Sequence, residues 1–130
     1  MKILLALTAI LEGIFGIGLL LIPVTVISIL LHTPIETAGG LFAARLCGAA
    51  IICIAICCWK ARGFESHQAA VGIVTAMLFY NFAAAAVLVY AGVRLGLQSP
   101  LIWPGIIAHA ALGFWCGALV WFSMRKQSFD

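Results

Sequence analysis

Four long apolar stretches, separated by short polar segments, make up almost the whole chain. The stretches cover residues 3–31, 40–59, 69–93 and 101–124. Each reaches or exceeds the ~20 residues that an α-helix needs to cross ~30 Å of hydrocarbon. Because the connections between them are short, consecutive helices are expected to be antiparallel neighbours. The pattern predicts an all-α, integral membrane four-helix bundle with up-down-up-down topology, forming a single transmembrane domain over residues 1–130.

The first stretch is longer than one untilted crossing requires, and Pro23 lies inside it. Proline lacks a backbone N–H and its ring collides with the preceding turn, so we expect a kink or a helix end near Pro23. The stretch starts after Met1 and Lys2, as a signal peptide would. It continues well past the apolar region of such a peptide, however, and Glu12 interrupts it. We therefore interpret it as a retained first helix.

Composition and charge agree with this class. Hydrophobic residues make up 65% of the 130 residues and charged residues 8%, whereas about a quarter of a soluble domain is charged. With alternating helices, Lys2, the loop 60–67 and the tail 125–130 fall on one side, and Glu36 and Arg94 on the other. The positive-inside rule then places both termini and the loop 60–67 in the cytoplasm. Since the basic residues form no patch beyond these flanks, no nucleic-acid partner is expected.

Each apolar stretch carries one strongly polar residue: Glu12, Arg45, Asn81 and His109. A charge at the bilayer centre costs ~2.5–3.5 kcal/mol, so such residues tend to face the bundle interior and find partners. Counting residues from the helix ends puts Arg45, Asn81 and His109 in one layer of the outer half, with Glu12 beneath them. We expect an ion pair between Glu12 and Arg45, and we include Tyr80, beside Asn81, as a weaker member.

The neighbours of these residues recur at helical spacing. The predicted stripes are Thr8, Glu12 and Gly16; Arg45, Ala49, Cys53 and Cys57; Met77, Asn81 and Ala85; and Gly105, His109, Gly113 and Gly117. Residues four apart share one helix face, and small residues let membrane helices approach closely. The four stripes are therefore predicted to be the contact faces. The polar layer either only fixes helix packing or lines a functional pocket.

No metal or cofactor is assigned. His109 suits three roles: an interior hydrogen-bonding residue, a proton-exchanging pocket residue, or a metal or haem ligand. A haem pair would need a second histidine at the same depth, but His32 and His67 lie in opposite loops. Thiols can bind soft metals, and the cysteines that could do so are Cys53, Cys57, Cys58 and Cys116. They contain no Cys-x-x-Cys, and small apolar packing is the favoured role.

Two segments carry a resemblance to a known family. Gly16-Ile-Gly-Leu-Leu-Leu-Ile-Pro23 precedes Gly39-Gly-Leu-Phe-Ala-Ala-Arg-Leu-Cys-Gly-Ala-Ala50, which continues to Trp59-Lys-Ala-Arg62. With Pro23 late in helix 1 and Arg45-Leu-Cys-Gly48 in helix 2, this first half resembles the DoxX-like group of small four-helix bacterial membrane proteins. The resemblance implies a four-helix bundle and, where a role has been proposed, an accessory subunit of a quinone-linked oxidoreductase.

Three functions are compatible with these features. The first is a non-enzymatic membrane protein that binds a hydrophobic small molecule, such as a lipid or a quinone, or acts as an accessory subunit of a larger membrane complex. The second is a membrane enzyme of proton-transfer or isomerase type on a lipid-soluble substrate, using Glu12, Arg45 and His109. The third is a transporter of small molecules or metal ions, formed as a homo-oligomer.

Overall fold

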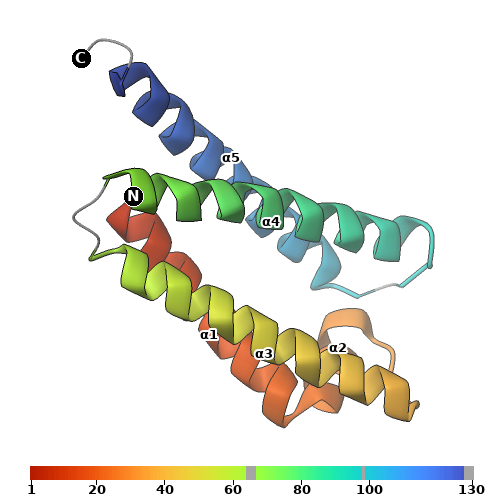
Figure 1. Ribbon diagram of the computed structural model, residues 1–130. Helices are drawn as coiled ribbons and strands as arrows, with labels where there is room; N and C mark the ends of the chain where they lie inside the picture. Colours follow the sequence, from red (N-terminus) through yellow and green to blue (C-terminus); the bar gives the residue numbers. More distant parts are fainter. Residues whose placement is uncertain (64–66, 98, 128–130) are drawn as a thin grey trace.

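The computed structural model describes residues 1–63, 67–97 and 99–127, and it is helical throughout these ranges apart from short connections (Figure 1). Its helices are α1 (Lys2–Leu21), α2 (Pro23–Leu31), α3 (Ala38–Ala61), α4 (His67–Val93) and α5 (Ile102–Gln127). Of these, α1, α3, α4 and α5 are long and apolar enough to cross a membrane. Parts of the predicted basic loop and tail, residues 64–66 and 128–130, lie outside the described residues.

The first apolar stretch forms two helices, with the break at Ile22. This residue leaves the helical conformation (φ −130°, ψ 53°), and α2 starts with Pro23 at its first position. Proline disfavours the helical conformation for the residue before it, yet its own fixed φ suits the start of a helix. The chain can therefore turn here and lay α2 across the end of α1 and α3.

Local capping sets the end of α2 and the start of α3. His32 closes α2 in the left-handed conformation (φ 53°), which is a common way to end a helix. Thr37 then caps α3, because its hydroxyl accepts a hydrogen bond of 3.0 Å from the amide of Gly40. That bond satisfies one of the donors that the first turn of a helix leaves unpaired.

Helices α1 and α3 form a tightly packed pair. Its closest approach joins Gly16 and Gly48. A Cβ added at Gly48 would lie 2.7 Å from the carbonyl oxygen of Gly16, and one added at Gly16 would lie 2.9 Å from the oxygen of Gly48. Only glycine allows two helix backbones to come this near, as in membrane helix pairs generally.

Helices α4 and α5 form the second pair, and the predicted stripe of α5 is their contact face. A Cβ at Gly105 would meet Leu88, one at Gly113 would meet Phe82, and one at Gly117 would meet Leu78. His109, the remaining member of the stripe, contacts Asn81 of α4. The ring of Phe82 also packs edge-on against Phe114, with centroids 5.3 Å apart.

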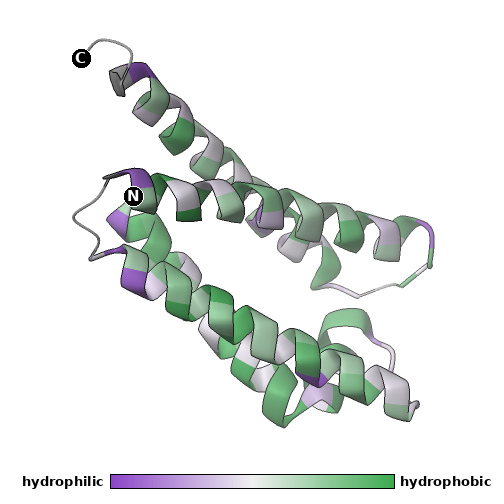
Figure 2. Cartoon of the chain, in the orientation of Figure 1, coloured by the Kyte–Doolittle hydropathy of each residue, from purple (hydrophilic) through white to green (hydrophobic). Residues whose placement is uncertain are grey.

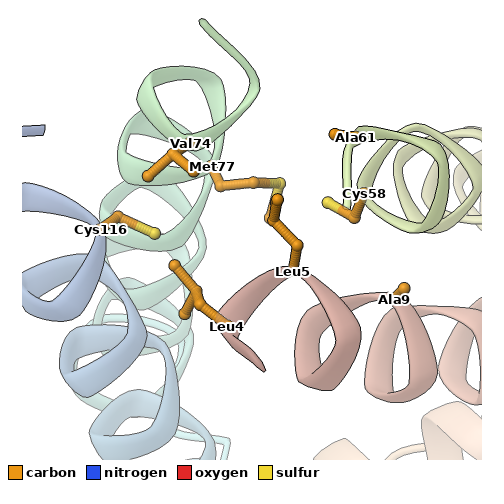
Figure 3. Close-up of a cluster of buried hydrophobic side chains, with 8 residues drawn as sticks. All are labelled: Leu4, Leu5, Ala9, Cys58, Ala61, Val74, Met77 and Cys116. Carbon is orange, nitrogen blue, oxygen red and sulfur yellow. The ribbon is translucent and has the colours of Figure 1, made fainter. Parts of the chain in front are cut away.

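The two pairs meet through one hydrophobic cluster (Figure 3). It brings together the start of α1, the end of α3, the first half of α4 and the middle of α5. Its buried members are Leu4, Leu5, Ala9, Cys58, Ala61, Val74, Met77 and Cys116. Away from it the pairs diverge, and α2 lies at the far end (Figure 1). There the hydroxyl of Ser99 donates a 3.3 Å hydrogen bond to the carbonyl of Ile29 in α2.

Apolar residues predominate along all the long helices (Figure 2). Large hydrophobic side chains stand exposed along all the long helices, among them Ile3 (76%), Phe79 (77%) and Phe114 (71%). Soluble monomers rarely expose continuous apolar surface of this extent. A helix that is apolar on every side is typical of a membrane span.

Candidate functional site

A hydrogen bond between the two helix pairs is the central feature of the polar interior. The hydroxyl of Tyr80 in α4 donates to Oε2 of Glu12 in α1 over 2.8 Å. Glu12 is buried and Tyr80 half-buried. A buried carboxyl group is costly unless it is hydrogen-bonded, so this contact both satisfies one oxygen of Glu12 and ties α1 to α4.

A second hydrogen bond holds the histidine of α5 against α4. Nδ1 of His109 lies 3.0 Å from Oδ1 of Asn81, while Nδ2 of Asn81 donates to the carbonyl of Met77 over 2.8 Å. A backbone carbonyl can only accept a hydrogen bond, so the amide nitrogen of Asn81 faces Met77 and its oxygen faces His109. The proton of a neutral imidazole therefore sits on Nδ1, and Nε2 is left as a hydrogen-bond acceptor.

Tyr80 also connects the two hydrogen bonds. Its ring packs edge-on against the ring of His109, with centroids 5.9 Å apart, while its hydroxyl reaches Glu12. The predicted residues Glu12, Asn81 and His109 thus come together, with Tyr80 between them. Of the polar atoms in this group, Nε2 of His109 and Oε1 of Glu12 have no hydrogen-bond partner among the residues that the structure describes.

Arg45 does not join this group, and the predicted ion pair with Glu12 is not formed. The hydrogen-bond partner of Glu12 is Tyr80, and Arg45 is exposed. It lies in a shallow groove between α1 and α3 with Leu20 and Phe42. The combination of Glu12, His109 and Arg45 that the enzyme hypothesis requires is therefore not assembled in this structure.

The rotation of α3 explains this difference. The predicted stripe begins at Arg45 and continues through exposed Cys53 and Cys57. The buried positions of the helix are instead Ala44, Gly48, Ile51, Ala55, Cys58 and Ala61. Both stripes have helical spacing and small residues. Gly48 decides between them, because it must face Gly16 for α1 and α3 to pack closely, and Arg45 is then turned outward.

The predicted stripes of α1 and α4 are buried. Thr8, Glu12 and Gly16 face the interior from α1, and Met77, Asn81 and Ala85 do so from α4. Thr8 stands one turn before Glu12 and is 1% exposed, and its hydroxyl is the buried side-chain oxygen that lacks a hydrogen-bond partner within the described part of the chain. Such orphan groups are uncommon and call for a water or ligand as explanation.

Tyr80 is the residue whose importance sequence reasoning understated. Asn81 and Tyr80 are about 100° apart on α4, so a helix with a single neighbour could not bury both. Helix α4 has two neighbours: it presents Asn81 to α5 and Tyr80 to α1. The available signal was chemical, because a tyrosine hydroxyl in an apolar segment needs a hydrogen-bond partner.

The cysteines form no ligand set. Cys58 and Cys116 are buried in the hydrophobic cluster, and Cys47, Cys53 and Cys57 are exposed; all five are free thiols. No group of three or more His, Cys, Asp or Glu side chains that could hold a metal ion occurs in the ranges that the structure describes.

The arrangement is suited to holding a polar group at the edge of an apolar region. Nε2 of His109 can accept a hydrogen bond, and the hydroxyl of Tyr80 is both donor and acceptor. Along nearly the same face of α4 as Tyr80, Val87 is 67% exposed, and in this half of the helix the two pairs diverge (Figure 1). In comparisons with known proteins, no family model, curated sequence or solved structure matches this chain.

Proposed function

We propose that the protein is a multi-pass membrane protein that binds a hydrophobic small molecule with a hydroxyl-bearing head, such as a quinol, between its two helix pairs. It would act as a binding protein or an accessory subunit, in keeping with its resemblance to the DoxX-like group. The observation that supports this most is the convergence of Glu12, Tyr80 and His109 from three helices that are mostly apolar.

Charge and aromatic residues support the membrane orientation within this proposal. Lys2, Lys60 and Arg62 lie at the end where α1 begins and α3 ends, and the guanidinium of Arg62 stacks 3.3 Å from the ring centre of Trp59. Arg125 stacks on Trp121 near the end of α5 in the same way. Trp–Arg pairs suit a lipid headgroup region. We therefore place this end and both termini on the cytoplasmic side of a bacterial inner membrane, with antiparallel crossings.

The chemistry of the head group follows from the open acceptor. With its proton on Nδ1, His109 offers Nε2 to a ligand hydroxyl, and a quinol has such a hydroxyl on a flat apolar ring. The carboxyl of Glu12 accepts the hydrogen bond of the Tyr80 hydroxyl and thereby fixes the orientation of that hydroxyl in the same site. The ligand tail would extend toward the exposed Val87, in the half of α4 where the two helix pairs diverge (Figure 1). Most ligand sites have this form, with few polar groups in an apolar lining.

The test is saturable binding of a short-chain quinol to the purified protein in lipid nanodiscs, kept reduced and followed by quenching of tryptophan fluorescence. Empty nanodiscs correct for partitioning. We expect Tyr80→Phe and His109→Leu to weaken binding about tenfold each, as the loss of a buried hydrogen bond of ~1.4 kcal/mol would. Tyr90→Phe and His32→Gln are the matched controls, since both side chains are exposed.

Two results would contradict the proposal. The first is that the quinol shows no binding beyond its partitioning into empty nanodiscs and that no lipid from the source membrane is retained either. The second is saturable binding that Tyr80→Phe and His109→Leu leave unchanged, because the ligand would then lie elsewhere.

A further inference from the structure

Arg45 lies in a groove of the α1–α3 pair whose lining includes no residue of α4 or α5. It is exposed in a groove of about 490 Å³, whose other lining residues include Leu20, Ala38, Phe42, Leu46 and Ala49. Phe42 and Leu46 are themselves 69% and 60% exposed. Except for the guanidinium, the lining is apolar.

Nothing in the described part of the chain neutralises this charge. The structure records no ion pair or hydrogen bond for Arg45 there, and Glu12, the carboxyl of the long apolar helices, is bonded to Tyr80 on the opposite side of the pair. An arginine inside a membrane normally pairs with an anion or extends to the headgroup region. The described residues therefore supply no anion for Arg45, and an anion from the surrounding membrane is the alternative.

The position of Arg45 along α3 matches the depth of a lipid phosphate. It follows the first residue of the helix, Ala38, by two turns, so its Cα lies about 10 Å below the helix start. The groove extends up to Ala38 itself, and a long arginine side chain can follow it toward the headgroups. The guanidinium then reaches the phosphate level while its stem stays in hydrocarbon.

Below Arg45 the same face offers a path for an acyl chain. Arg45, Ala49, Ile52 and Ile56 follow one another at i, i+4, i+7 and i+11, which keeps them on one side of α3. A second shallow groove of about 450 Å³ lies between α1 and α3 at Ile52 and Ile56. The stripe is about 16 Å long, close to the ~15 Å thickness of one hydrocarbon leaflet.

We infer that this groove binds one phospholipid of net negative charge from the leaflet on the side where α3 begins, with its phosphate on Arg45 and an acyl chain along Ala49–Ile56. Charge complementarity favours a lipid over a second copy of the chain, since the same apolar face of a second copy has no carboxylate that could pair with Arg45. The inference rests on the membrane insertion proposed above, but it does not depend on the ligand between the helix pairs.

The experiment is native mass spectrometry of the protein released from vesicles of equal phosphatidylglycerol and phosphatidylcholine content. We expect the wild type to retain one phosphatidylglycerol. Arg45→Gln should reduce the retained fraction about fivefold, which corresponds to ~1 kcal/mol for a basic residue facing an anionic lipid. Arg45→Lys should keep most of the preference, and Arg94→Gln, which removes an exposed arginine just after α4, should change nothing.

Several results would overturn the inference. They are equal retention of the two lipids by the wild type, equal loss in Arg45→Gln and Arg94→Gln, or a dimer whose formation depends on Arg45 and which carries no lipid. Circular dichroism of each variant checks that the helices remain, so that a fall in lipid retention with intact helicity supports the site. Quinol binding should be unaffected by Arg45→Gln, which separates this inference from the function proposed above.

Discussion

The contact between Gly16 and Gly48 predicts that one added methyl group will destabilise the α1–α3 pair. In Gly48→Ala the new Cβ would lie 2.7 Å from the carbonyl oxygen of Gly16 and 2.8 Å from the amide nitrogen of Leu20. Both are backbone atoms, so no side chain can rotate out of the way. A comfortable carbon contact is ~3.5 Å or more. The helices would have to separate by roughly 0.7 Å at this point.

The magnitude follows from two opposing effects. A gap of this size forfeits about a quarter to a half of the attraction of each contact along the interface, and overpacking costs ~1–3 kcal/mol. Alanine in a helix gains ~0.5–1 kcal/mol over glycine. We expect Gly48→Ala to lower the free energy of unfolding by a net ~1–2 kcal/mol.

The assay is unfolding in mixed micelles with increasing sodium dodecyl sulfate, followed by far-ultraviolet circular dichroism. Gly72→Ala is the matched control, because a Cβ at Gly72 in α4 has nothing within 4 Å. That variant should show only the gain in helix propensity, or no change. If Gly48→Ala proved as stable as Gly72→Ala, the close approach of α1 and α3 would be refuted.

Two further predictions concern the interior. In a double-mutant cycle, Tyr80→Phe and Glu12→Leu should each destabilise the protein, with a coupling of ~0.5–1.5 kcal/mol from their shared hydrogen bond; additive effects would mean that the two side chains do not interact. A small neutral thiol reagent should modify Cys57, which is exposed near the end of α3, before the buried Cys58 and Cys116. Mass spectrometry of peptides follows the modification of each site, and equal rates at these three cysteines would contradict the packing of the hydrophobic cluster.

The candidate site was predictable only in part. Three of the four proposed polar residues, Glu12, Asn81 and His109, do come together, because a strongly polar side chain in an apolar helix is stabilised by turning inward. The same reasoning predicted an interior position for Arg45, but Arg45 faces outward. A long flexible cation can satisfy its charge at a membrane surface, whereas a short carboxyl, amide or imidazole cannot.

Residue pattern alone determined the elements of this protein. Length and hydropathy specify the four long helices, because a helix satisfies its backbone hydrogen bonds internally wherever it lies. The helix break at Ile22 follows from Pro23 by local geometry. The contact faces of α1, α4 and α5 follow from the spacing of small and polar residues. All of these are local properties, read within a few turns of one helix.

Tertiary structure decided what no single helix contains. Helix α3 has two stripes of small residues, and only the meeting of Gly48 with Gly16 selects the buried one. Tyr80 lies between Glu12 and His109 because α4 contacts α1 as well as α5. The divergence of the two pairs depends on a cluster drawn from four helices. These outcomes depend on which distant surfaces fit closely, and helical spacing alone cannot rank them.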